Sequence, residues 1–218
     1  MKGIWWKALG IILVLYSIIA GLLGEVPRLV ILNETIRVLY YHVPMWFSMV
    51  AMMTISLVFS IRALGEKRGA DLRASEFAQT GFLLATLGLL TGMVWARFTW
   101  GNFWTNDPKL NGTAVTMLIY LAYFVLRNSV EDPAKKARLA AVYNIFAFVM
   151  MIVFIGILPR MTDSLHPGNG GNPGFNQYDL NSDMRPIFYA AVLGWILIGT
   201  WISSLRIRYK SLSNEEHS

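Results

Sequence analysis

Histidine is the residue type in this chain best suited to metal binding, and it occurs only at positions 42, 166 and 217. His42 lies in LYYHVPMW, and His166 lies in MTDSLHPGNGG, a stretch with too few apolar residues to pack by itself. A neutral imidazole binds metals through a ring nitrogen. The chain has no cysteine, so thiolate ligands, cysteine nucleophiles and disulfides are excluded.

An aromatic segment, residues 95–113 with the sequence WARFTWGNFWTNDPKLNGT, carries Trp95, Trp100, Phe103 and Trp104. Gly, Asn, Asp and Pro interrupt it, so it cannot cross a bilayer as an ordinary helix. We expect it at a membrane surface, where indole rings are stable. Its flat ring faces could receive a large planar apolar ligand, and Gly101 would let the backbone approach that ligand closely.

Two charged residues of the same segment have identifiable roles. Asp107 precedes Pro108, the usual opening of a helix, with Asp as the N-cap and Pro at the first helical position. Arg97 lies among the aromatic residues, and its guanidinium could bind a ligand carboxylate through two parallel hydrogen bonds. Met45 and Met49, at helical spacing from His42, are candidate soft ligands, although packing is their simpler role.

Composition places the chain in the membrane. Hydrophobic residues make up 55% of the 218 residues and charged residues 15%, whereas charged residues approach about a quarter of a soluble domain. A helix needs about 20 mostly apolar residues to span the bilayer. We therefore predict an all-α polytopic integral membrane protein with six transmembrane helices and an outer tryptophan-rich segment. The predicted spans are 4–24, 44–61, 77–95, 110–127, 140–158 and 186–205.

Basic residues predict the orientation of these spans. The side that holds both termini has 13 Lys and Arg residues, and the other side has 6. Since basic residues favour the cytoplasmic side, both termini should be cytoplasmic, and segments 95–113 and 159–185 should lie outside. The basic residues cluster at the ends of apolar runs, and no basic stripe alternates with aromatic residues, so the net charge of +6 does not indicate nucleic-acid binding.

This orientation puts two histidines on one membrane face. Pro44 disfavours helical geometry at the residue before it, so a helix should begin or kink there, with His42 at its outer end. His166 lies in the outer loop, whereas His217 lies in the opposite tail. Each outer histidine taken alone could be a solvated boundary residue. Taken together they could hold a haem iron from opposite sides of one macrocycle.

The string WGNFWTND at 100–107 resembles the tryptophan-rich "WWD" signature of haem-handling proteins of cytochrome c biogenesis. LYYHVPMW resembles the histidine segment of the CcmC family, and SLHPG looks like the second histidine of that family. The length of six helices is also similar along nearly the whole chain. The family usually has Trp where this chain has Asn106, often has aromatic residues where this chain has Met161 and Thr162, and has a shorter loop after the second histidine.

The resemblance implies haem b held between His42 and His166 as axial ligands, in a bacterial inner membrane. It implies that the outer segment serves as the haem platform, and that haem passes to a periplasmic chaperone similar to CcmE. Subunits similar to the CcmAB transporter would be partners, and the chain would deliver haem rather than act as an enzyme. The platform residues are Trp95, Arg97, Trp100, Gly101, Phe103, Trp104 and Asp107.

Two alternatives stay open at this stage. A haem lyase component of the CcsA or CcmF type would attach haem directly to apocytochrome, although those chains generally carry more histidines and helices. An unrelated transporter or electron-transfer subunit would use the aromatic residues only as anchors. Solute transport would require ionisable groups within the spans, and the six predicted spans contain almost none.

Overall fold

The computed structural model describes residues 3–167, 174–175 and 179–216, and its described residues contain helices and no strand. Six helical segments are long and apolar enough to cross a membrane, which confirms the predicted all-α polytopic membrane fold. The elements are α1 (Trp5–Leu23), η1 (Asn33–Val38), α2 (Leu39–Leu64), α3 (Ala70–Trp100), α4 (Pro108–Ser129), α5 (Pro133–Met151), η2 (Ile152–Ile157), α6 (Leu158–Met161) and α7 (Met184–Glu216). His217 and residues 168–173 and 176–178 of the predicted outer loop lie outside the described residues.

Helical structure extends beyond most of the predicted spans, and the extensions of α2 and α3 affect the candidate site. Helix α2 begins at Leu39, so the expectation that a helix begins at Pro44 is corrected: Pro44 lies inside α2, and the 3-10 turn η1 leads directly into it. Helix α3 continues through Trp95 to Trp100, the first part of the segment expected at the surface. The reason is that residues 95–100 contain no Gly or Pro, and the helix ends only at Gly101, whose φ of 85° is left-handed.

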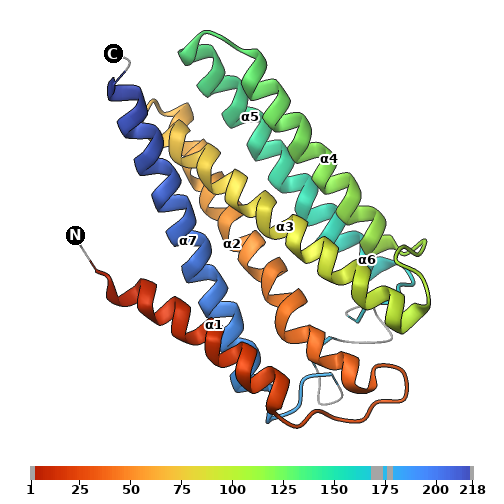
Figure 1. The fold of residues 1–218 in the computed structure, drawn as a ribbon. Coiled ribbons are helices and arrows are strands. Elements are labelled where there is room, and N and C mark those ends of the chain that lie inside the picture. The colour runs from red at the N-terminus through yellow and green to blue at the C-terminus, as the bar shows by residue number, and fades with distance from the viewer. Residues whose placement is uncertain (1–2, 168–173, 176–178, 217–218) are drawn as a thin grey trace.

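The helices run side by side as one bundle (Figure 1). Helices α2 and α3 form the most extensive pair, α1 packs along α7, and α4 packs along α5. The α2–α3 and α4–α5 connections and the C-terminus lie at one end, which we call the basic end. The α1–α2 and α3–α4 connections lie at the opposite end, which we call the tryptophan end.

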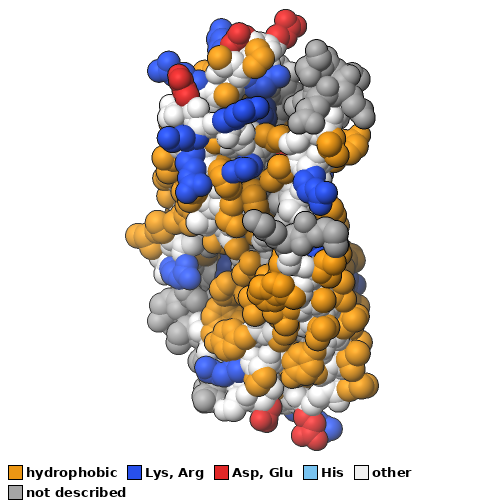
Figure 2. All heavy atoms as spheres, turned by 90° about the vertical axis from the view of Figure 1, so that its left-hand side faces the viewer, with side chains coloured by type: hydrophobic (Ala, Val, Ile, Leu, Met, Phe, Trp, Pro, Cys, Tyr) orange, Lys and Arg blue, Asp and Glu red, His pale blue; other side chains and the backbone are white. Residues whose placement is uncertain are grey.

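Methionines fill much of the core where α2 meets its neighbours. Met45, Met49, Met52 and Met53 are all nearly inaccessible to solvent. Met45 and Met49 therefore pack, as their simpler role predicts. The surface is different: on the face drawn in Figure 2, hydrophobic side chains form a broad area, and Lys and Arg gather toward the basic end.

The fifth membrane-crossing segment contains a π-helical stretch, η2, before it reaches α6. Pro159 follows, and its lack of an N–H removes one ordinary helical hydrogen bond from this region. Helix α4 approaches the stretch so closely that a Cβ built on Gly112 would lie 2.3 Å from the carbonyl oxygen of Phe154. This contact positions the chain that leads to residues 162–167.

Candidate functional site

His42 lies in the first turn of α2, at the tryptophan end, as predicted. Its Nδ1 is 2.9 Å from the carbonyl oxygen of Gly88 and 3.3 Å from the hydroxyl oxygen of Thr91, both on α3. A carbonyl only accepts, so Nδ1 carries the proton and donates to Gly88. The neutral ring therefore keeps a lone pair on Nε2, the form that binds a metal.

Glycine lets the imidazole lie against α3. A Cβ built on Gly92 would lie 2.5 Å from Cε1 of His42, well inside van der Waals contact. Two indoles flank the ring edge to face, with centroid distances of 6.1 Å to Trp46 and 5.8 Å to Trp95. Sequence reasoning missed Gly88 and Gly92, although their spacing, Gly-x-x-x-Gly, is a known signal for close helix packing in membranes.

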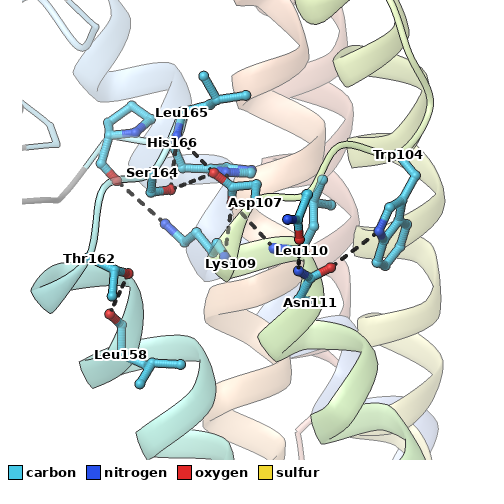
Figure 3. Close-up of polar contacts among 12 residues, drawn as sticks. Trp104, Asp107, Lys109, Leu110, Asn111, Leu158, Thr162, Ser164, Leu165 and His166 are labelled. Carbon is cyan, nitrogen blue, oxygen red and sulfur yellow. Dashed lines mark hydrogen bonds and ion pairs between the residues drawn. The ribbon is translucent and has the colours of Figure 1, made fainter.

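His166 is held from a different part of the chain (Figure 3). Its Nδ1 lies 2.9 Å from Oδ1 of Asp107, and its ring centroid lies 4.8 Å from that of Trp100. The imidazole is 20% exposed, and the Asp107 side chain is 1% exposed. Carboxylates that accept from one ring nitrogen of a histidine commonly orient the other nitrogen toward a metal.

Asp107 caps α4 and clamps the loop at the same time. Its carboxylate accepts from the backbone N–H groups of Lys109 (2.9 Å) and Leu110 (3.4 Å), which confirms the predicted N-cap. It also accepts from the Ser164 hydroxyl and the Leu165 N–H, each at 2.8 Å (Figure 3). One carboxylate thus joins the start of α4 to residues 164–166.

Opposing effects set the charge of this carboxylate. Burial raises the pKa of Asp107, but the hydrogen bond and positive charge of His166, with the hydrogen bonds from Leu165 and Ser164, together hold that pKa below its ordinary value. Asp107 is therefore ionised at neutral pH and accepts the Nδ1 proton of His166. The Nε2 atom of His166 keeps its lone pair whenever the ring is neutral.

The two imidazoles lie at the same end of the bundle. The indoles that contact them, Trp95 and Trp100, both belong to α3, five residues and about 7.5 Å of helix rise apart. Two parts of the chain more than a hundred positions apart thus each place a histidine at the tryptophan end.

The aromatic segment divides into a helical part and a loop part. Trp95 is half-buried, and its indole N–H donates to Thr35 at 3.3 Å. Phe103 and Trp104, beyond Gly101, are 52% and 40% exposed. The indole N–H of Trp104 donates to Oδ1 of Asn111 at 3.3 Å, which ties the loop to α4 (Figure 3).

The cations of this end are used in different ways. Arg97 is exposed, and its guanidinium donates to the carbonyl of Gly101, so it closes the helix end. Arg37 pairs with Glu34 at 2.8 Å and donates to the carbonyls of Gly21 and Gly24. Lys109, one of the six basic residues predicted to lie on the outer side, donates to the carbonyl of Pro167 at 3.5 Å, beside His166.

Among the described residues, neither His42 nor His166 has a hydrogen-bond partner at Nε2, so each imidazole offers a nitrogen that can bind a metal. In the part of the chain that the structure describes, no three His, Cys, Asp or Glu side chains are grouped to hold a metal ion. A pair of imidazoles beside indole rings suits an iron whose other four ligands come from a porphyrin. The residues therefore fit a haem better than a free metal ion.

Comparison with known proteins identifies similar chains. The sequence model of the CcmC family, described as heme exporter protein C, matches residues 2–218. Heme exporter protein C of Bradyrhizobium diazoefficiens is 32% identical over 114 residues, which cover 52% of this chain and 43% of that protein. The Escherichia coli protein of the same name is 22% identical over 178 residues, 81% of this chain and 70% of that protein.

A second group of relatives carries another name. Cytochrome c biogenesis protein CcsA of Prochlorococcus marinus is 39% identical over 77 residues, 35% of this chain and 24% of that protein. The chain spans about half the length of the heme exporter proteins of Bradyrhizobium diazoefficiens and Rhodobacter capsulatus, with 43% and 57% of those proteins covered.

Proposed function

Because the chain belongs to the CcmC family of heme exporter proteins, we propose that it binds haem at the tryptophan end and delivers it for cytochrome c maturation. His42 and His166 are the axial ligands of the iron, and the bound group is haem b. The chain acts as a haem-binding and haem-delivery protein rather than as an enzyme.

The protonation pattern of the two imidazoles carries this proposal. Each Nδ1 is engaged, by the Gly88 carbonyl and by the Asp107 carboxylate respectively. Each Nε2 is therefore the nitrogen left to bind iron. Each ring also lies against an indole of α3, so a planar macrocycle between them would meet aromatic side chains.

The surrounding residues have supporting roles in the proposal. Trp95 and Trp100 form the wall of the platform, and the exposed Phe103 and Trp104 cover the outer part of the ring. Lys109, with its ammonium group near both His42 and Pro167, pairs with a propionate. Gly101 ends α3 and so separates the wall from the loop.

Delivery requires that haem can leave. Residues 164–166 belong to a loop that is bound to the Asp107 carboxylate, so withdrawal of His166 needs no helix to unfold. The recipient in this proposal is a periplasmic chaperone similar to CcmE, and subunits similar to CcmAB assemble with the chain. The membrane is the bacterial inner membrane, with the tryptophan end outside and both termini in the cytoplasm.

The test is the haem content of purified protein. The His42→Ala/His166→Ala double variant should lose the haem absorption bands, while His217→Ala, the matched control at the tail, should keep them. Unchanged haem content in the double variant would reject axial ligation by this pair. Co-purification with an apocytochrome instead of a chaperone would favour the haem lyase alternative.

A further inference from the structure

A hollow that opens at the basic end extends toward the middle of the bundle, as far as Thr86 on α3. It is a cavity of about 600 Å³ between α3, α4 and α7. Its walls toward the middle of the bundle are apolar and include Phe82, Leu83, Phe124 and Ile202. A cavity of about 500 Å³ adjoins it and shares Ser75, Arg127, Asn128 and Lys210.

Each of the three helices orders its lining residues in the same way. On α3 the polar Ser75 and Gln79 precede Leu83, and on α7 Ile202 precedes Arg206 and Lys210. On α4 Phe124 precedes Arg127. Since α3 leaves the basic end and α4 and α7 arrive there, the polar residues of α3 and the cationic residues of α4 and α7 lie toward the basic end, and the apolar residues lie deeper. The hollow is therefore an amphipathic groove with a cationic mouth.

Positive charge exceeds negative charge at this mouth. Arg127 pairs with Asp71, with one N–O distance of 2.6 Å. Glu76, 0% exposed, pairs with both Arg206 (2.7 Å) and Lys210 (2.6 Å).

Lys136 is a fourth cation at the mouth, whereas Asp71 and Glu76 are its two anions. The net charge of these lining residues is therefore about +2, which favours the binding of an anion. Arg206 and Lys210 are 41% and 43% exposed, so an anion can reach them.

We propose that this groove binds an anionic phospholipid, with its phosphate at Lys136 and Lys210 and one acyl chain along Phe82, Leu83 and Phe124. Basic pockets between membrane helices at the cytoplasmic side are suited to anionic headgroups. The volume falls within the range of about 300–1,000 Å³ of small-molecule sites. A partner helix, about 10 Å wide, would require a groove along the whole bundle.

Native mass spectrometry of the purified full chain tests the headgroup contact. Phosphatidylglycerol and phosphatidylcholine with identical acyl chains are titrated separately. The wild type should prefer phosphatidylglycerol, and Lys136→Gln/Lys210→Gln should lower that preference about tenfold. Glu76 keeps Arg206 as its partner in this variant, so the fold is retained.

The matched control is Lys135→Gln/Arg208→Gln, which removes two exposed cations of the same end that do not line the groove. It should keep the preference. Equal binding of the two lipids by the wild type, or an equal loss in the control, would overturn the proposal. A groove that seats a partner helix would give the first of these outcomes.

The acyl-chain contact has its own test. Thr86 lines the apolar part of the groove, and its hydroxyl donates within α3, to the Phe82 carbonyl. Thr86→Phe should lower the affinity for both lipids about fivefold, while Leu87→Phe, one position along and outside the groove, should not. Unchanged binding by Thr86→Phe would overturn the placement of the chain. Haem content should stay at the wild-type level in all these variants, which separates this proposal from the haem site.

Discussion

The two histidines of the site are attached to the bundle in contrasting ways. His42 belongs to a helix, donates to a backbone carbonyl of the adjoining helix, and fills a space that only a glycine leaves open. His166 belongs to a loop, contacts the Trp100 ring and donates to the Asp107 carboxylate, which also holds Ser164 and Leu165. Moving His42 requires separation of α2 from α3, whereas moving His166 requires the loss of side-chain contacts and no separation of helices.

The difference assigns different tasks to the two ligands in the proposed function. A ligand fixed by helix packing keeps the same position with and without haem. A ligand fixed by a carboxylate can be exchanged for a ligand from a partner protein. The predictions below test this division, from the largest expected effect to the smallest.

Removal of the carboxylate should have the largest effect. Asp107→Ala deletes a helix cap and the acceptor of several buried donors, so the free energy of unfolding should fall by roughly 3 kcal/mol. Haem content should fall with it, because His166 loses its anchor. Thermal unfolding in detergent and absorption spectra measure the two effects. Asp107→Asn keeps one acceptor oxygen, so its stability and haem content should lie between those of Asp107→Ala and the wild type. Wild-type stability and haem content in Asp107→Ala would show that this carboxylate does not hold residues 164–166 in place.

A methyl group added at Gly92, which contacts the His42 ring, should have the next largest effect on stability and haem content. Gly92→Ala places a Cβ where the imidazole lies, so it should destabilise the protein by about 1–3 kcal/mol and lower haem content. Gly156→Ala is the control, because the nearest atoms to its Cβ would be 3.9 Å away. Equal melting temperatures and haem contents for the two variants would show that the α2–α3 contact does not fix His42.

The stabilisation that the Asp107 carboxylate provides should be lost in a defined range of acid pH. A carboxyl whose pKa is lowered by folding stabilises the folded state above its unfolded pKa, and the stabilisation is lost as pH falls toward the folded pKa. The pKa of Asp107 is lowered in this way. The difference in unfolding free energy between wild type and Asp107→Asn should therefore not shrink between about pH 7 and about pH 5, and it should shrink below about pH 4. Chemical denaturation across this range measures it, and a difference that shrinks already above about pH 6 would contradict the assignment.

A substitution in the loop part of the aromatic segment should have the smallest effect on stability and haem content. Trp104→Leu removes a half-exposed ring and one hydrogen bond to Asn111, so it should cost less than about 1 kcal/mol and leave most of the haem bound. Trp100→Leu, the same change on α3, removes the ring that contacts His166 and should release more haem. Equal haem contents in the two variants would show that the ring on α3 and the ring beyond Gly101 contribute equally to haem binding.

Apolar length and local helix signals were enough to predict much of this fold. The six membrane-crossing helices follow from runs of apolar residues, and the start of α4 follows from the Asp-Pro pair at 107–108. The end of α3 did not follow from hydropathy, because helix geometry persists beyond the apolar run until Gly101 permits a left-handed turn. Glu76, just outside the predicted third span, was overlooked for the same reason.

The site was only partly predictable, because its contacts join distant segments. The count of basic residues predicted a shared face for His42 and His166, and the structure brings both to the tryptophan end. The cap role of Asp107 is local and was visible in sequence, whereas its bonds to Ser164, Leu165 and His166 span 57–59 positions. The bond from the Arg97 guanidinium to the carbonyl of Gly101, four residues away, was not predicted, and the binding of a ligand carboxylate by Arg97 stays a prediction.

The π-helical stretch at Ile152–Ile157 precedes the loop that carries His166 and affects the position of that loop. A π turn accommodates one residue more than an α turn, so deleting a single residue there would restore the regular spiral. The π turns absorb that extra residue, so the direction of Leu158–Met161 and of the imidazole that follows would change little. The same deletion within the regular helix of Pro133–Met151 would instead rotate everything downstream by about 100° about the axis, and the imidazole would turn away from the carboxylate at the start of α4. The fifth membrane-crossing segment therefore tolerates the loss of one residue at Ile152–Ile157 far better than in its α-helical part.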